Sequence, residues 1–315
     1  MPPRRGRRSV RCGLLAIACL IVHAAPAFAQ GAPQLAALAP APGAADDARR
    51  AVAIGPSGEV YEPDGNGAWV RRQRITTAST LSSAARAGGA VVAVGDGVVY
   101  RLAPNGWSAI RLAQKDKAKL AAGWGAVAAV GRQLLALDRM AGGEPAKLGA
   151  AVGEILLVGA GRSIVVATER GLFRLDGARA APIAAPRRAK LLIGDQWAIV
   201  DGGAVELRTG KTTAWPAGMS IEVAAVGHDE RLIAVARAGD ARELIAVRAG
   251  KLERAPIEAA GADAAVGVAV DGAGRAVIAF RDGRIAVRGG GAWTTVTVGE
   301  QLPPPRPGAP PAASR

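Results

Sequence analysis

Two short clusters of basic residues are the strongest chemical signal in this 315-residue chain. One cluster alternates lysine with other residues and the second sets two arginines close to a lysine. Together their members are Lys115, Lys117, Lys119, Arg187, Arg188 and Lys190. Clustered ammonium and guanidinium groups attract carboxylates and other anions. The clusters therefore predict a binding surface for an anionic partner, and the plainer interpretation is that they are solvated charges that keep loops soluble.

Residues suited to acid–base or metal chemistry are sparse. Of the two histidines, only His228 follows residue 29, so a multi-histidine metal site is excluded beyond that point. A Ser-His-Asp triad would need His228, but the chain has no Gly-x-Ser-x-Gly turn. Six of the 26 acidic residues are aspartates in Asp-Gly pairs, which are typical of turns. A sialidase-type nucleophile would have to be Tyr61 or Tyr100, and both lie in expected third strands of their blades. The sequence predicts no catalytic residue, metal or cofactor.

A repeated pattern of short apolar strands and glycine turns must position the basic clusters. The clearest copy covers residues 81–112, with apolar runs at 91–94, 98–102 and 107–112 separated by Gly-Asp-Gly and Asn-Gly turns. Seven copies follow one another at a spacing of roughly 33 to 43 residues, the range of β-propeller repeats. We therefore expect an all-β fold, a single β-propeller of seven four-stranded blades, with six or eight blades as alternatives.

The two ends of the chain differ in composition from the repeats. Residues 1–29 join five arginines to an apolar run and end in Ala27-Phe28-Ala29, the layout of a secretory signal peptide cleaved near Ala29/Gln30. Residues 30–48 are rich in alanine and proline, with a first strand expected near 35–38. The propeller is expected over 49–298. A proline-rich tail, predicted to be disordered, covers 299–315.

Export predicts a periplasmic or extracellular protein. No later apolar run approaches the 20 or so residues that span a bilayer. Both cysteines, Cys12 and Cys19, lie in the segment to be removed. Cys19 is the alternative lipid-attachment site, which we disfavour because apolar residues continue past it. Loss of the five arginines lowers the formal charge from +14 to +9. The remaining charge fits an acidic partner, and export argues against nucleic acid.

The predicted blades place the two basic clusters on equivalent loops. Each cluster lies where the fourth strand of one blade leads into the first strand of the next. In a propeller all such loops emerge on one face. Residues 71–74, Arg-Arg-Gln-Arg, end a fourth strand beside the same kind of loop. We call the predicted surface the basic loop face, formed by Lys115, Lys117, Lys119, Arg187, Arg188 and Lys190.

Two stretches resemble known propeller repeats. Residues 97–102, Gly-Val-Val-Tyr-Arg-Leu, followed by Asn105-Gly106-Trp107, are similar to the repeats of bacterial secreted propellers. Residues 204–215 resemble one pyrroloquinoline-quinone-type repeat, with a Thr-Gly-Lys turn and a tryptophan after it. This second resemblance implies relatives that scaffold outer-membrane assembly. It covers about a dozen residues in one blade only.

Two functions remain open at this point. The first is a non-catalytic interaction or scaffold module that docks an envelope or extracellular protein, or an acidic polymer, on the basic loop face. The alternative is a propeller enzyme acting on polysaccharide or another anionic substrate. An enzyme would need polar residues on the first strands that line the channel. The expected first strands, such as residues 156–158, 191–193 and 266–268, carry no charge. This favours the interaction module.

Overall fold

The structure is a computed structural model, and its description covers most of the repeated region. The described residues are 33–39, 51–64, 66–75, 80–87, 90–95, 98–103, 106–111, 119–122, 126–141, 144–148, 153–177, 179–184, 188–227, 229–258, 263–270 and 274–299. The predicted signal peptide and residues 300–315 of the predicted tail lie outside this description. So do His228, Lys115, Lys117 and Arg187.

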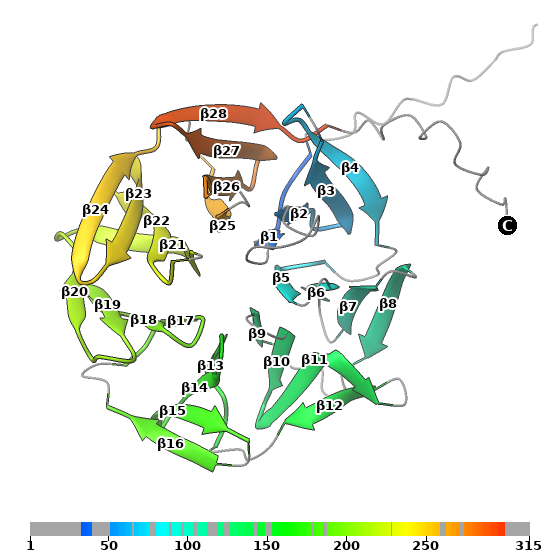
Figure 1. Cartoon of the computed structure of the whole chain (residues 1–315). Helices are drawn as coiled ribbons and strands as arrows, with labels where there is room; N and C mark the ends of the chain where they lie inside the picture. The colour runs from blue at the N-terminus through cyan, green and yellow to red at the C-terminus, as the bar shows by residue number, and fades with distance from the viewer. Residues whose placement is uncertain are drawn as a thin grey trace, which may run out of the picture. The chain divides into compact units, whose positions relative to one another are not determined.

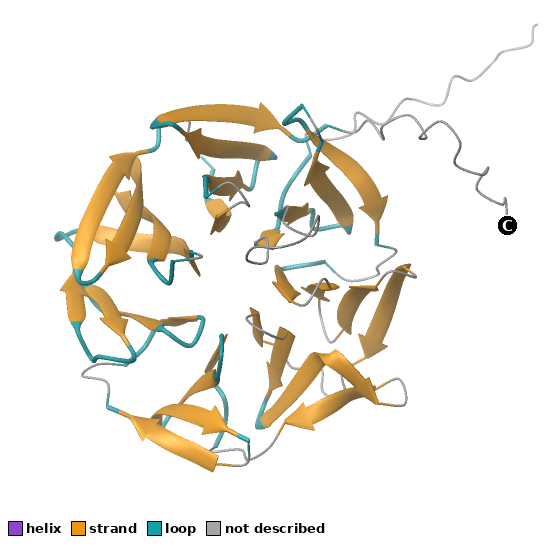
Figure 2. Ribbon diagram, in the orientation of Figure 1, coloured by secondary structure: helices purple, strands orange, loops and turns teal. Residues whose placement is uncertain are grey.

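The described residues form twenty-eight strands, paired as seven antiparallel four-stranded sheets (Figure 2). Each sheet, or blade, takes four consecutive strands in chain order. Blade 1 contains β1 (Ala37–Ala39), β2 (Val52–Ile54), β3 (Glu59–Pro63) and β4 (Trp69–Arg74). Blade 2 contains β5 (Ser83–Ala87), β6 (Ala90–Gly95), β7 (Val98–Ala103) and β8 (Gly106–Arg111). Blade 3 contains β9 (Lys119–Ala122), β10 (Ala126–Val130), β11 (Gln133–Ala141) and β12 (Glu144–Leu148).

The remaining four blades follow the same order. Blades 4 and 5 contain β13 (Leu157–Ala160), β14 (Ile164–Thr168), β15 (Gly171–Asp176), β16 (Arg179–Ile183); and β17 (Leu191–Ile193), β18 (Trp197–Val200), β19 (Gly203–Glu206), β20 (Thr212–Ala214). Blades 6 and 7 contain β21 (Met219–Val226), β22 (Leu232–Ala238), β23 (Ala241–Arg248), β24 (Lys251–Pro256); and β25 (Ala265–Val270), β26 (Ala276–Phe280), β27 (Arg284–Gly289), β28 (Ala292–Thr297).

The seven blades form a closed ring (Figure 1). The first strand of each blade lies nearest the centre and the fourth lies at the periphery. Each first strand contacts the first strands of both neighbouring blades, and β25 contacts β1. The prediction of a seven-blade β-propeller is therefore confirmed, against the alternatives of six or eight.

Apolar second strands supply the core between blades. β2, β18 and most of β22 are buried along their length, and their residues are chiefly valine, isoleucine and alanine. Strands buried on both faces read as such continuous apolar runs, because each face packs on a neighbouring sheet. Buried clusters accordingly combine residues of adjacent blades, for example Trp197 of β18 with Leu232 and Ile245 of blade 6.

Glycine allows the first strands to converge near the centre. A Cβ on Gly159 of β13 would collide with the carbonyl oxygen of Gly194 in blade 5. A Cβ on Gly267 of β25 would collide with Leu38 of β1 in blade 1. The blades meet too closely at these two points for any side chain.

The ring closes without exchanging a strand between its ends. Blade 7 owns its fourth strand, β28, and β1 belongs to blade 1. The Leu35 amide donates to the Arg281 carbonyl at 3.0 Å, and the Gly299 amide donates to the Trp69 carbonyl at 2.8 Å. We call these contacts, with the Leu38–Gly267 contact, the closure seam. The first strand expected near 35–38 is present as Ala37–Ala39.

The first strands do not all lie where the sequence analysis expected them: residues 156–158 were expected in blade 4, and β13 covers Leu157–Ala160. In blade 2 the strand begins at Ser83 and runs to Ala87, and buried Leu81 precedes it. In blade 6 the strand begins at Met219 and includes Glu222 at a bulge. Glu222 places a charged side chain on this first strand.

Candidate functional site

The described part of the basic loop face lies at one edge of blade 5. Arg188 and Lys190 precede β17, and both are exposed. Lys190 forms an ion pair with Asp201, which lies in the β18–β19 turn at the same edge. Lys119 begins β9. The structure thus brings Arg188 and Lys190 together and offsets the charge of Lys190, while Lys115, Lys117 and Arg187 fall outside the described residues.

A buried ion pair lies between blades 6 and 7. The Glu222 carboxylate of β21 accepts from Arg242 Nε at 2.9 and 3.1 Å, and the two side chains are 14% and 5% exposed. The same carboxylate accepts from the Ala265 amide at 3.0 Å, at the start of β25. It therefore ties blade 6 to blade 7. Removing one partner of such a pair would leave a buried charge uncompensated, so we assign it a structural role.

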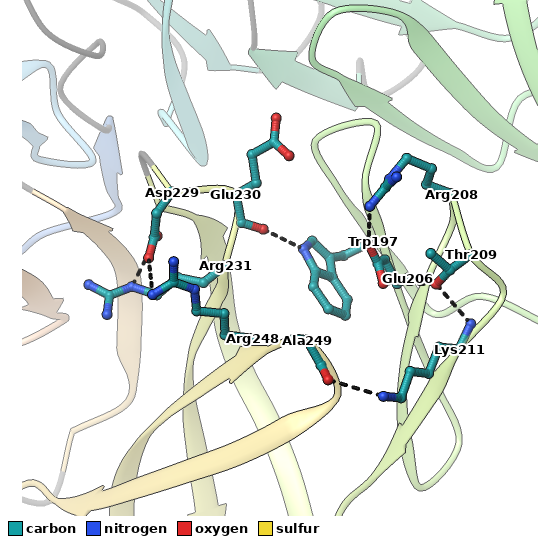
Figure 3. Close-up of a pocket in the computed structure, with 10 residues that line it drawn as sticks. All are labelled: Trp197, Glu206, Arg208, Thr209, Lys211, Asp229, Glu230, Arg231, Arg248 and Ala249. Carbon is teal, nitrogen blue, oxygen red and sulfur yellow. Dashed lines mark hydrogen bonds and ion pairs between the residues drawn. The ribbon is translucent and has the colours of Figure 1, made fainter.

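The opposite edge of blades 5 and 6 forms an open groove of about 380 Å³ (Figure 3). Two turns of blade 5 and two turns of blade 6 line it, at the ends of β17, β19, β21 and β23. Consecutive antiparallel strands reverse direction, so these turns lie on the face away from the basic loop face. The lining residues are Trp197, Glu206, Arg208, Thr209, Lys211, Asp229, Glu230, Arg231, Arg248 and Ala249.

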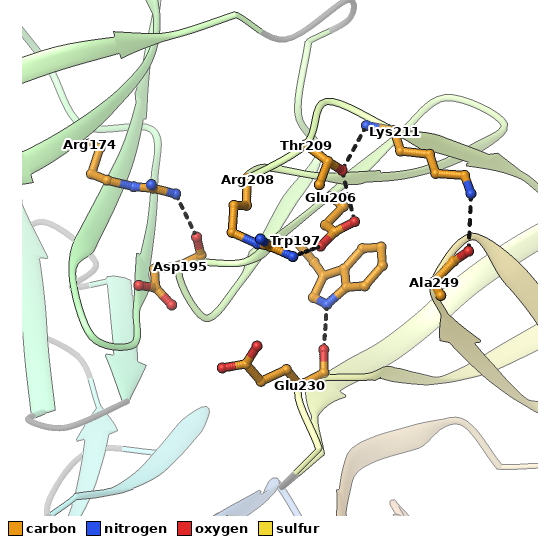
Figure 4. Close-up of polar contacts among 9 residues, drawn as sticks. All are labelled: Arg174, Asp195, Trp197, Glu206, Arg208, Thr209, Lys211, Glu230 and Ala249. Atoms are coloured by element: carbon orange, nitrogen blue, oxygen red, sulfur yellow. Dashed lines mark hydrogen bonds and ion pairs between the residues drawn. The ribbon is translucent and has the colours of Figure 1, made fainter.

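Trp197 joins the two blades beneath the groove. Its side chain is buried, with the whole residue 4% exposed, and its indole Nε1 donates to the Glu230 carbonyl at 3.0 Å. Lys211 makes a second link, because its Nζ donates to the Ala249 carbonyl at 3.0 Å. Figure 4 shows both contacts crossing from blade 5 to blade 6.

The two carbonyls that accept these bonds belong to residues in an unusual backbone conformation. Glu230 has a φ of 64° and Ala249 a φ of 50°, the positive values of non-glycine residues among those described. The left-handed conformation costs roughly 1–2 kcal/mol for a residue with a Cβ. Such residues concentrate at sites where the surrounding structure fixes the backbone for a purpose. Here the two conformations place the Glu230 carbonyl where it accepts from Trp197 and the Ala249 carbonyl where it accepts from Lys211.

Charged side chains surround the groove in ion pairs. Arg208 lies 3.6 Å from Glu206, Arg231 lies 3.3 Å from Asp229, and Arg248 lies 3.9 Å from the other Asp229 oxygen. In two of the three pairs the cation is the more exposed partner: the Arg208 side chain is 78% exposed against 22% for Glu206, and Arg248 is 70% exposed against 37% for Asp229. Arg231, at 33%, is slightly less exposed than Asp229. The groove therefore presents the Arg208 and Arg248 guanidinium groups outward, and the Glu230 carboxylate, 58% exposed, also faces solvent.

A second polar link lies beside the groove, between blades 4 and 5. The buried Asp195 carboxylate accepts from the Ser163 amide at 2.9 Å and from its hydroxyl at 2.8 Å. Arg174 donates to the Asp195 carbonyl at 3.2 Å (Figure 4). Gly161 leaves room for the carboxylate, because a Cβ there would collide with it. These bonds fix the turn that leads into Trp197.

One carboxyl pKa in the described structure is shifted by a neighbour. Arg254 Nε and Nη2 bind the two Glu243 oxygens at 2.6 and 2.8 Å on the outer strands of blade 6. The hydrogen bond from Arg254 holds the pKa of the Glu243 carboxyl below its ordinary value. A glycosidase acid needs the opposite shift.

The sequence analysis did not identify the groove. It did single out residues 204–215, and the hairpin within them supplies Glu206, Arg208, Thr209 and Lys211. A second signal was present in residues 229–231, Asp-Glu-Arg, three charges in one turn. Within the described ranges, no three or more histidine, cysteine or acidic side chains gather as a metal site would require. Nor does that part of the chain include a helix long and apolar enough to cross a membrane.

No known family model matches the chain, and no curated protein matches its sequence. Solved structures match its fold. A streptogramin B lyase aligns with a TM-score of 0.56 at 10% identity, covering 81% of this chain and 93% of its own. YCF48 from Cyanidioschyzon merolae aligns with a TM-score of 0.56 at 16% identity, over 81% and 95%. The WD40 β-propeller domain of Doa1 aligns with a TM-score of 0.52 at 10% identity, over 79% and 90%.

These identities are low, so the likeness defines the fold alone. The class of protein is a seven-blade β-propeller. The similar structures include an enzyme as well as a WD40 domain. The fold alone is therefore compatible with catalysis and with binding.

Proposed function

We propose that the chain is a non-catalytic β-propeller that acts outside the cytoplasm as an interaction or scaffold module. One observation carries the proposal: carboxylates that could act as acids or bases are held in structural contacts. Glu222 is bound by Arg242, Glu243 by Arg254, and Asp195 by Ser163. A general acid needs a carboxyl group that keeps its proton near the working pH. The pKa of Glu243 moves the other way.

The basic loop face would supply the docking surface for an anionic envelope or extracellular partner. The exposure of Arg188 supports this role, and the pairing of Lys190 with Asp201 reduces it at that point. Exchange of Arg187 and Arg188 for serine should weaken binding to anionic envelope material. Exchange of Arg179 and Lys251, which are exposed at the starts of fourth strands and so lie at the opposite edge of their blades, removes the same charge and serves as the matched control. Equal affinity of both double variants would contradict the docking role.

Catalysis and export have separate tests. Incubation of the purified protein with anionic polysaccharides should release no new reducing ends or unsaturated products, and turnover would contradict the proposal.

Expression of the full chain in a bacterial host should yield a mature protein starting near Gln30, measured by mass spectrometry of the secreted or periplasmic fraction. A cytoplasmic protein of full length would contradict export.

A further inference from the structure

We propose that the groove between blades 5 and 6 binds an acidic peptide segment through Arg208 and Arg248. This site is independent of the basic loop face, because it lies at the opposite edge of the blades. It is also formed entirely by described residues. Its volume of about 380 Å³ falls within the range of ligand sites, roughly 300–1,000 Å³.

The two arginines have donors to offer. Their contacts with Glu206 and Asp229 join one nitrogen to one oxygen at 3.6 and 3.9 Å, longer than a hydrogen bond. A guanidinium has five N–H donors in a planar fork that suits a carboxylate. The side chains are 78% and 70% exposed, so most of each fork faces solvent. Arg231 and Lys211 bring the cations of the lining to four, against the three carboxylates of Glu206, Asp229 and Glu230, so the lining has an excess of one positive charge.

Many of the acceptors of the groove are already occupied. The Glu230 carbonyl accepts from Trp197, and the Ala249 carbonyl accepts from Lys211. The Thr209 hydroxyl donates to Glu206 at 2.8 Å and accepts from the Lys211 amide at 3.2 Å. Sugar hydroxyls need donors and acceptors together, whereas a carboxylate needs donors alone. Trp197 is too buried for its ring to stack on a sugar. These contacts favour an acidic peptide over an acidic polysaccharide.

One cation of the groove, Lys211, is held in place before a ligand binds. A Cβ on Gly250 would collide with the end of the Lys211 side chain, so glycine at this position lets Lys211 lie across the β23–β24 turn. The left-handed Ala249 then presents its carbonyl to Lys211. A side chain ordered before binding loses less conformational entropy when a ligand arrives. The position of Lys211 therefore favours a binding groove over a surface of solvated charges.

The test uses the mature chain and a short fluorescein-labelled peptide of alternating aspartate and glutamate, measured by fluorescence polarisation at low salt. The double variant Arg208→Ser/Arg248→Ser should lose about tenfold in affinity, as expected for charge-assisted hydrogen bonds. Arg179→Ser, an exposed arginine in blade 4 at the same edge of its sheet, is the matched control and should change little. Circular dichroism verifies that each variant is folded.

Several results would overturn the proposal. The first is that the unaltered protein does not bind the peptide. The second is that the double variant binds it as tightly as the unaltered protein does. The third is that Arg179→Ser loses as much affinity as the double variant. Tighter binding of an oligogalacturonate through the same two arginines would assign the groove to polysaccharide instead. The variant Arg248→Glu gives a second readout, because it should abolish binding of the acidic peptide and admit a lysine-rich one. Arg188→Ser separates the two faces, because it alters the basic loop face alone.

Discussion

The interface between blades 7 and 1 and the interface between blades 5 and 6 join neighbouring sheets by different means. The closure seam uses backbone bonds, from Leu35 to Arg281 and from Gly299 to Trp69, and a direct approach of Gly267 to Leu38. The second interface uses side chains, with Trp197 and Lys211 reaching across to blade 6. It also leaves a groove lined by charge.

The difference separates stability from binding. Backbone bonds and apolar contact at the closure seam hold two ends of one chain together. The side-chain links between blades 5 and 6 hold two left-handed residues in place beside exposed arginines. Substitutions at the closure seam should therefore change the free energy of unfolding, and substitutions at the groove should change binding more than folding.

The largest effect is expected from Gly267→Val. The new side chain would meet the backbone nitrogen and Cα of Leu38, which cannot move away as a flexible side chain would. Overpacking of this kind costs roughly 1–3 kcal/mol, and we expect about 3 kcal/mol in the free energy of unfolding, measured with urea. Gly289→Ala is the control, because its Cβ would meet only the side chain of Arg275. Equal free energies of unfolding for the two variants would show that the closure seam does not contribute more to stability than an exposed position does.

An intermediate effect is expected from Gly250→Ala. Its φ of 76° strains an alanine by roughly 1–2 kcal/mol, and the new Cβ displaces Lys211. Gly291→Ala is matched, because it is the second residue of the equivalent turn in blade 7, with a φ of 89° and open space around it. The two variants should lose similar stability in urea, and only Gly250→Ala should weaken acidic-peptide binding. Parallel losses of affinity would show that Lys211 does not shape the groove.

The smallest effect concerns pH. Because the Glu243 pKa is lowered in the folded state, the folded protein binds fewer protons than the unfolded chain. The stabilisation is therefore present above the ordinary carboxyl pKa of 4.5 and is lost as pH falls through the lower folded value. Glu243→Gln should flatten this part of the stability curve, with Glu253→Gln, on the adjacent strand, as the control. An unchanged acid limb would show that the pair with Arg254 adds nothing in solution.

The repeat pattern predicted the ring of blades because each blade depends on local sequence features. Apolar runs such as β6 and β22, and glycine at tight turns, recur in every blade and can be read one segment at a time. Strand boundaries are harder to predict, because a buried residue such as Leu81 can precede a strand, and a bulge such as the one in β21 has no signature in residue type.

The groove could not be predicted from local sequence features. Its walls come from separate segments around residues 197, 206–211, 229–231 and 248–249, which only the ring brings together. The left-handed conformations of Glu230 and Ala249 have no signature in residue type, since neither position holds glycine. The hairpin at 204–215 was noticed for its resemblance to a repeat, and the role of its charged residues became visible only beside blade 6.

Amide hydrogen exchange with and without the acidic peptide tests the central claim most directly, because it reports both interfaces in one measurement. The account predicts added protection in residues 207–211, 229–231 and 248–251, and none at Leu35 or Gly299. Protection that spares the groove turns, or that appears at the closure seam instead, would contradict it.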